Sequence, residues 1–165
     1  MLISAIAAIS SNRVIGKNNQ IPWYLPADLK FFMRTTQNHH VLMGRKNYQS
    51  IGKPLPRRTN VIITRDPFFV STGCVVVHSI EEAIKVAYEN GEQEAFIIGG
   101  GQIYEQAMPF VSRIYLSEID MEIDGDVFFP ELDPAEWLVE NEEYRAPDER
   151  NKHAFTIRVY NRLTG

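Results

Sequence analysis

Three consecutive glycines, Gly99 to Gly101, separate an apolar run from a helix-like segment in EAFIIGGGQIYEQ, residues 94–106. Glycine loses more backbone entropy on folding than any other residue and adds no side-chain packing, so three in a row are costly. Without Cβ atoms, a ligand can approach the chain closely, and free N–H groups at a helix start can bind phosphate. The run therefore favours a phosphate loop. The alternative is a bare strand-to-helix turn, for which one glycine would normally suffice.

The glycine run departs from the dinucleotide fingerprint G-x-G-x-x-G. Gly99 and Gly101 match its first half, but Tyr104 stands at the third glycine position. A Rossmann unit would also usually carry this motif near its start. We therefore predict a dinucleotide or phosphate loop of another kind.

Asp28 is an acid among apolar neighbours. Trp23 and Leu25 precede it, Leu29 follows it, and Phe32 shares its face on the helix predicted for this segment. A carboxylate partly removed from water could hold a protonated ligand nitrogen or tune a proton transfer. The alternative is an exposed first-turn acid stabilised by the helix dipole, and this segment alone does not decide between them.

Several cationic side chains follow strand ends or flank a proline-stiffened loop, where anions could bind. Arginine can pair with a carboxylate or a phosphate through two hydrogen bonds. For any one of these residues, a solvated surface charge is the alternative. The groups are Arg45 with Lys46, Arg65 after Thr64, and Lys53 with Arg57 and Arg58.

The sequence predicts neither a metal site nor a nucleophilic triad. His39 and His40 are neighbours at the start of an expected strand and should point in opposite directions. His78 and His153 stand alone, and no Ser-His-Asp set is convincing.

The elements that must position these residues alternate between strands and helices. This alternation predicts an α/β sandwich with a mostly parallel sheet and an antiparallel edge. In such sheets, ligands bind beyond the carboxyl ends of the strands. Strands are predicted at 2–9, 40–44, 60–64, 74–78, 95–99 and 112–120, helices at 26–36, 45–52, 79–91 and 102–108, and an antiparallel pair at 137–145 and 153–162.

Composition predicts one domain, residues 1–165, because the chain has 165 residues and is 44% hydrophobic. The first residues lack a basic leader, and their apolar run is too short to cross a bilayer. Cys74 is the single cysteine, so we expect a reducing cytoplasm and a small core residue.

The charge is divided unevenly along the chain. Residues 1–78 carry 10 Lys and Arg but only two acids, Asp28 and Asp66, whereas residues 79–165 carry 7 against 19. Either the fold interleaves the halves and the asymmetry is accidental, or the first half builds a site for a polyanionic ligand. Nucleic acid is disfavoured because there is no basic helix and no RNA-reading motif.

Three long segments closely resemble bacterial chromosomal dihydrofolate reductases: AIAAISSNRVIGKNNQIPWYLPADLKFF, VLMGRKNYQSIGKPLPRRTNVIIT and FIIGGGQIYEQ. The resemblance covers essentially the whole chain. IPWYLPADL, MGRK and IGGGQIY are specific in combination, although any one alone would not be.

The resemblance implies a three-layer α/β fold: a central, mostly parallel eight-stranded sheet with an antiparallel C-terminal strand, flanked by about four helices. It also implies NADPH-dependent reduction of 7,8-dihydrofolate to tetrahydrofolate, with hydride passing to C6 and a proton to N5. Asp28 matches the family's single essential carboxylate, which orients the pterin and raises the basicity of N5 while water delivers the proton.

The resemblance also assigns substrate contacts. Trp23 matches a residue that fixes a water and borders the pterin, and Ser117 replaces the family's usual Thr beside the carboxylate. Arg58 matches the residue that grips the glutamate carboxylate, and Lys53 a secondary tail contact. The expected pterin and benzoyl pocket comprises Ile6, Ala7, Leu29, Phe32, Ile51, Leu55 and Ile98.

For the cofactor, the resemblance implies a pyrophosphate loop at the glycines, with a cis bond between Gly99 and Gly100. Tyr104 matches an aromatic residue near the nicotinamide, placed with the catalytic residues although not as a general acid. Arg45, Thr64 and Arg65 resemble a 2′-phosphate site that favours NADPH. The other expected cofactor contacts are Ala8, Ile15, Gly16, Asn19, Ile21, Gly44, Lys46, Asn47, Ile63, His78, Gly101, Gln102, Ile103 and Gln106.

Residues 14–24 resemble a mobile loop that closes over the nicotinamide, and Asp126 matches an acid that latches it. Some positions depart from close relatives and leave cofactor affinity and loop rates open. Gln102 stands for an Arg, Asn47 for a Thr, Lys46 for a His, Arg65 for a Ser, and Ile21 for a Met.

Two rival functions remain. A reductase of the same fold could act on another heterocycle, such as a ribosylaminopyrimidine, although Asp28 within PWYLPADL argues against this. A non-catalytic NADP- or nucleic-acid-binding module would bind tightly without turnover. The expected partners are dihydrofolate and antifolate inhibitors, with no nucleic acid and no membrane, and a monomer is the family default.

Overall fold

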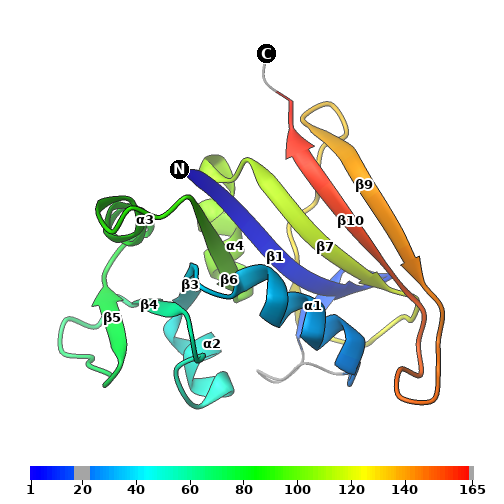
Figure 1. The fold of residues 1–165 in the computed structure, drawn as a ribbon, viewed down its shortest axis with the longest axis horizontal. Coiled ribbons are helices and arrows are strands. Elements are labelled where there is room, and N and C mark those ends of the chain that lie inside the picture. The colour runs from blue at the N-terminus through cyan, green and yellow to red at the C-terminus, as the bar shows by residue number, and fades with distance from the viewer. Residues whose placement is uncertain (17–22, 164–165) are drawn as a thin grey trace.

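A computed structural model of the protein describes residues 1–16 and 23–163. Its main feature is an eight-stranded sheet in the order β5-β4-β3-β6-β1-β7-β10-β9 (Figure 1). All neighbouring pairs are parallel except those of β10, which is antiparallel to both β7 and β9. The strands are β1 Leu2–Ser10, β3 His40–Gly44, β4 Thr59–Ile63, β5 Cys74–Val77, β6 Glu94–Gly99, β7 Arg113–Ile119, β9 Trp137–Arg145 and β10 Phe155–Arg162. The predicted sheet and its antiparallel C-terminal strand are confirmed.

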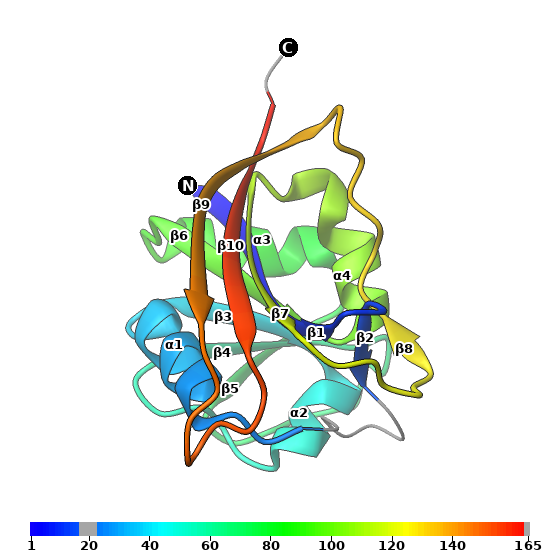
Figure 2. The same cartoon turned by 90° about the vertical axis from the view of Figure 1, so that its right-hand side faces the viewer.

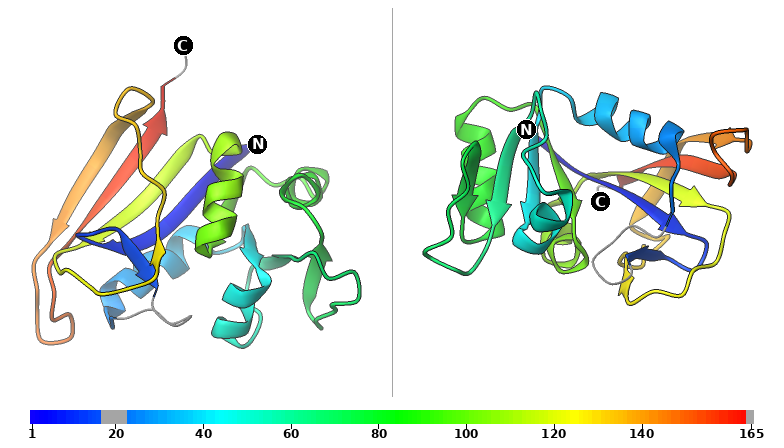
Figure 3. Two further views of the ribbon diagram at one scale, coloured as in Figure 1. Left: turned by 180° about the vertical axis from the view of Figure 1, so that it is seen from behind. Right: turned by 90° about the horizontal axis from the view of Figure 1, so that it is seen from below.

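Helices cover both faces of the sheet and complete the three predicted layers (Figure 3). The described residues form four α-helices, α1 Pro26–Thr36, α2 Arg45–Ile51, α3 Ile80–Glu89 and α4 Gly101–Ala107, followed by a short 3-10 helix at Met108–Phe110. Helices α3 and α4 bury Ala83 and Ala107 in one core cluster with Leu42 of the sheet. On the other face, α1 and α2 pack Phe32 and Ile51 against a second cluster.

Local sequence signals set the helix ends. Pro26 opens α1 and Asp28 lies in its first turn. Gly52 ends α2 with a φ of 87°. At α3, the Ser79 side chain accepts a hydrogen bond from the Glu82 N–H at 3.1 Å, but the Glu82 carboxylate accepts one from His78 instead of returning to Ser79. Only half of a capping box therefore forms.

A small second sheet was not predicted. Strand β2, Val14–Gly16, pairs with β8, Val127–Phe128, in an antiparallel manner (Figure 2). Beside it, the Asp126 N–H donates to the Gly16 carbonyl over 3.3 Å. This places Asp126, the expected latch, directly next to the start of the segment expected to be mobile.

The parallel strands bring their carboxyl ends to one edge of the sheet. β1 ends at Ser10, β6 at Gly99, β3 at Gly44 and β4 at Ile63. Ligand sites of α/β proteins lie at such an edge. Within residues 1–16 and 23–163, no helix is long and apolar enough to cross a membrane.

Candidate active site

Asp28 lies in the first turn of α1, which crosses the sheet over β1 and β7. Leu25 is 4% exposed and anchors the chain just before the helix, in a cluster that also takes in Ala8 and the half-buried Trp23. Ser117 of β7 is buried beside Ala8, its register partner on β1. Burial raises the pKa of Asp28, and hydrogen bonding with the Ser117 hydroxyl opposes that rise. The carboxyl is therefore partly removed from water and held by a polar partner.

Most of the expected substrate-lining side chains gather on the same face as Asp28. Ile6 and Ile98 of the sheet share one cluster with Phe32 of α1, Ile51 of α2 and Leu55 after it. Residues from separate chain segments thus form one apolar surface.

Ala7 and Leu29 differ from this group. Strand alternation turns the side chain of Ala7 to the opposite face, where it packs with the α3 and α4 cluster. Only the backbone of Ala7 is available on the Asp28 face. Leu29 is 56% exposed on the outer side of α1.

The Arg58 guanidinium is fixed in place by acceptors from two segments. Its Nε donates to Thr36 Oγ1 at 2.8 Å, and its terminal nitrogens donate to the carbonyls of Met33 and Pro56. Burial, and then the neighbouring charge of Arg57, lower the pKa of Arg58. Such a pre-oriented fork suits a carboxylate. Lys53 lies exposed nearby in sequence.

Each of the three glycines has a different surrounding. Gly99 has a φ of 114°, and a Cβ there would meet the Tyr104 ring at 3.0 Å. A Cβ on Gly101 would lie 2.6 Å from Val127 Cγ1 of β8. A Cβ on Gly100 would meet no atom within 4 Å. The peptide bond between Gly99 and Gly100 is cis, as the resemblance implied.

Open space beside Gly100 leaves the strand-to-helix turn approachable from outside. The protein itself accounts for the glycines at 99 and 101: Gly99 has a positive φ and a Cβ there would press on Tyr104, and a Cβ on Gly101 would collide with Val127. It does not account for Gly100. Gly44 ends the neighbouring strand β3. A Cβ at this position would lie 2.9 Å from Ile103 of α4, so packing also accounts for this glycine.

The hydroxyl of Tyr104 has a structural role. Its OH donates to the Ile6 carbonyl at 2.7 Å, and its ring lies 5.0 Å from that of Phe129. Burial raises the pKa of Tyr104 above its ordinary value. The hydroxyl is thus un-ionised and committed to β1, which agrees with excluding it as a general acid.

The expected 2′-phosphate residues follow two adjacent strands: Arg45 comes directly after β3, and Thr64 and Arg65 come after β4. His78, expected only as a cofactor contact, follows the next strand, β5. The ring Nδ1 of His78 lies 2.8 Å from the Thr64 carbonyl, which ties the last two strand ends together. Arg65 is exposed. The topology therefore gathers Arg45 and Arg65 at one corner of the sheet edge.

Asp66 plays a part at this corner that was not predicted. Its carboxylate pairs with Arg45 at 3.0 Å, while the Arg45 guanidinium also stacks 4.4 Å from the centre of the Phe69 ring. The N–H of Phe68 and the charge of Arg45 hold the pKa of Asp66 below its ordinary value. Arg45 is thus partly neutralised. The signal that could have indicated this pairing is that Arg45 and Asp66 each follow the end of a strand, and these two strands, β3 and β4, are parallel neighbours.

Most of the other expected cofactor residues follow strands or belong to elements that begin at the same edge. The Asn47 side chain donates to the Ile98 carbonyl at 3.3 Å. Ile15 and Gly16 belong to β2, and Ile63 closes β4. Lys46, Gln102 and Gln106 are exposed, and Ile103 is buried. Asn19 and Ile21 lie outside the described residues.

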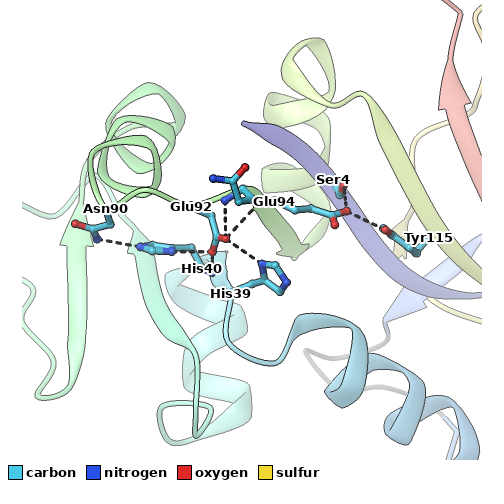
Figure 4. Close-up of polar contacts among 8 residues, drawn as sticks. Ser4, His39, His40, Asn90, Glu92, Glu94 and Tyr115 are labelled. Carbon is cyan, nitrogen blue, oxygen red and sulfur yellow. Dashed lines mark hydrogen bonds and ion pairs between the residues drawn. The ribbon is translucent and has the colours of Figure 1, made fainter.

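The prediction that His39 and His40 point apart was wrong. Both rings converge on Glu92, with His39 Nδ1 and His40 Nδ1 each 2.9 Å from a carboxylate oxygen (Figure 4). His39 precedes β3, so strand alternation does not separate the two rings. Burial raises the pKa of Glu92, but hydrogen bonds from His40 and His39 outweigh it and bring the pKa to about 2. The described residues contain no group suited to a metal ion.

Fold and site together are those of an α/β protein whose candidate cofactor-binding residues lie at the carboxyl edge of a mostly parallel sheet. A family model for dihydrofolate reductase matches residues 2–162, so the chain belongs to the dihydrofolate reductase family.

Individual relatives agree with the family match. The chain is 40% identical to a dihydrofolate reductase of Bacillus subtilis, over 96% of this chain and 94% of that one. It is 44% identical to a dihydrofolate reductase of Haemophilus influenzae, over 93% and 94%. A solved structure of Enterococcus faecalis dihydrofolate reductase with NADP(H) and the compound RAB-propyl superposes with a TM-score of 0.93 at 34% identity, covering 99% of this chain and 97% of that one.

Proposed function

We propose that this protein reduces 7,8-dihydrofolate to tetrahydrofolate with NADPH as the hydride donor. The observation that carries the proposal is the partly buried Asp28, with its raised pKa, facing Ser117 above the apolar surface of Ile6 and Phe32. Membership of the dihydrofolate reductase family supports the reaction.

The substrate would lie along the α1 face with its two ends held by charge. Asp28 would accept hydrogen bonds from the amino and ring N–H groups of the pterin, which orients the ring and raises the basicity of N5. The apolar surface would take the pterin and benzoyl groups. Arg58, already aimed by Thr36, would take the terminal carboxylate through two hydrogen bonds.

The cofactor residues fit a dinucleotide with a 2′-phosphate. The unfilled side of Gly100 allows a pyrophosphate to approach the backbone, and Arg45 with Arg65 supplies positive charge for the extra phosphate. When bound, NADPH supplies the hydride that reduces C6. The chain's own residues would bind, orient and exclude water, with Trp23 fixing the water that delivers the proton to N5.

We further propose that the chain works as a single domain and as a monomer in the cytoplasm, and that antifolate inhibitors occupy the same face. The Enterococcus faecalis relative is complexed with both NADP(H) and RAB-propyl, which supports the part of the proposal that concerns small-molecule binding.

The test is the loss of NADPH absorbance after mixing the purified protein with dihydrofolate, with NADH in parallel and with tetrahydrofolate identified as product. Rapid, NADPH-selective loss is expected. Saturable NADPH binding without turnover would instead favour a binding module, and turnover only with another heterocycle would favour a reductase of different specificity.

A further inference from the structure

The start of α1 lacks a cap of its own. Leu25 occupies the N-cap position and offers no side-chain hydrogen bond, and Pro26 at the first helical position has no N–H. Ala27 therefore carries the first backbone donor that the helix leaves unpaired. The next residue is Asp28, so the state of this N–H bears directly on the carboxyl.

A residue distant in sequence satisfies this donor. The Ala27 N–H donates to Asn151 Oδ1 at 2.9 Å across a separation of 124 residues. Asn151 lies in the loop between β9 and β10, which passes the start of α1 in Figure 2, and only 6% of it is exposed. The cap of the Asp28 helix is thus supplied by the hairpin loop.

Asp148 holds Asn151 in turn. Asp148 Oδ1 accepts from the Asn151 backbone N–H at 2.7 Å and from its side-chain amide at 3.0 Å. The Asp148 N–H donates back to the Asn151 carbonyl at 2.8 Å. With its amide nitrogen engaged by Asp148, the side chain of Asn151 has its oxygen directed at Ala27.

The same bonds with Asn151 hold the pKa of Asp148 below its ordinary value. Asp148 is therefore ionised at neutral pH, and the anchor does not change its charge in the working range.

We propose that Asn151 is a positioning residue for Asp28: by capping α1 from the β9–β10 loop, it fixes the depth and direction at which the carboxyl enters the site. Two independent points then locate Asp28, the helix start held by Asn151 and the Ser117 hydroxyl on β7. This inference rests on the proposed reaction, in which Asp28 contacts the substrate.

Titratable groups of the same loop lie near the helix start. Among the described residues, burial and Ser117 are the influences that shift the pKa of Asp28. The titratable residues of this loop that line a cavity with Trp23, Tyr24 and Pro26 are Glu149, Arg150, Lys152 and His153.

The first variant is Asn151→Ala, measured at saturating NADPH. Loosening the first turn should let water reach the carboxyl, so kcat/KM for dihydrofolate should fall about ten- to a hundredfold, while the Kd of NADPH stays unchanged. A carbon-13 NMR titration of the free protein should show the pKa of Asp28 moving down, by about half a pH unit or more.

Two further variants separate positioning from folding. Asp148→Ala leaves the Asn151 oxygen in the protein but removes the hydrogen bonds that orient it. Smaller decreases of kcat/KM and of the pKa of Asp28 are therefore expected, and they can be measured even if Asn151→Ala fails to fold. The double variant Asp148→Asn, Asn151→Asp keeps an acceptor for the Ala27 N–H without placing carboxylates at both 148 and 151. It should recover most of the lost kcat/KM.

Ser79→Ala serves as the matched control because it removes a helix cap of the same kind from α3. It should lower Tm without moving kcat/KM for dihydrofolate or the pKa of Asp28. If Asn151→Ala behaves in the same way, the positioning role is overturned. If the unaltered protein does not turn over dihydrofolate at all, the proposed function itself fails, and the NMR titration still reports whether Asn151 places Asp28.

Discussion

Ser117 on β7 and Asp28 on α1 act on each other across the layer between sheet and helix. Burial raises the pKa of Asp28, and hydrogen bonding with the Ser117 hydroxyl lowers it. The working pKa of the carboxyl is therefore a balance between removal from water and one polar partner.

Ser117→Ala should raise the pKa of Asp28 further, because the carboxylate loses the group that stabilises its charge. A carbon-13 NMR titration of the Asp28 carboxyl measures this directly. Ser117→Thr keeps a hydroxyl at the position and should leave the pKa near that of the unaltered protein. An unchanged pKa in Ser117→Ala would show that the hydroxyl has no influence on the carboxyl.

Asp28→Asn should stabilise the protein at pH 7. The pKa of Asp28 is raised above the ordinary 3.8, so the folded chain retains a proton that the unfolded chain loses, and stability falls as pH rises through that interval. At neutral pH the titratable carboxyl therefore makes the folded state less favourable relative to the unfolded state, and Asn removes this cost. Thermal unfolding should show a higher Tm for the variant at pH 7 and no gain below pH 3.8. A lower Tm at pH 7 would indicate that the charge stabilises the fold.

Gly100→Ala and Gly101→Ala should affect different properties of the protein, the first its affinity for NADPH and the second its stability. A Cβ at Gly100 meets no protein atom within 4 Å, so the variant should keep its Tm but bind NADPH at least about tenfold more weakly. A Cβ at Gly101 would come within 2.6 Å of Val127, so that variant should lose stability. Thermal unfolding and NADPH titration separate the two. Normal NADPH affinity in Gly100→Ala would remove the glycine turn from the cofactor site.

Arg65→Ala should weaken NADPH binding much more than NADH binding. Arg45 is already paired with Asp66 at 3.0 Å, whereas no ion pair joins Arg65 to another described residue. Arg65 is therefore the cation more available to a 2′-phosphate. The dissociation constants of NADPH and NADH are measured for the unaltered protein and for Arg65→Ala. An equal loss of affinity for the two cofactors would mean that Arg65 does not contact the 2′-phosphate. Arg150→Ala is the control for loss of a surface arginine. Arg150 lies in the loop between β9 and β10 and not after β3 or β4, so this variant should leave both dissociation constants unchanged.

Much of the fold could be predicted from local patterns. The apolar run at 2–9, the terminal pair at 137–145 and 153–162, and the helix from Pro26 to Thr36 all appear where periodicity and end signals placed them. Strands β2 and β8 were missed because they have three and two residues, too few for an alternating pattern to show.

The contacts that the sequence could not predict join distant segments. Glu92 accepts from two histidines more than fifty residues away, and Asn151 reaches Ala27 across 124. Neither spacing nor hydropathy reports such pairs, because they exist only once the sheet has ordered the strands. The function was predicted from the resemblance to a known family, which gave roles to Asp28, Arg58 and the glycines, whereas the contacts that support these residues became visible only in the structure.

The most direct test of the account is the pH dependence of kcat/KM for dihydrofolate in Asp28→Asn, measured with saturating NADPH. Because Asp28 is assigned the task of raising the basicity of N5, the variant should bind NADPH normally and lose turnover by orders of magnitude near pH 7. It should retain relatively more activity at low pH, where the substrate is already protonated. Turnover close to that of the unaltered protein at pH 7 would contradict the assigned role.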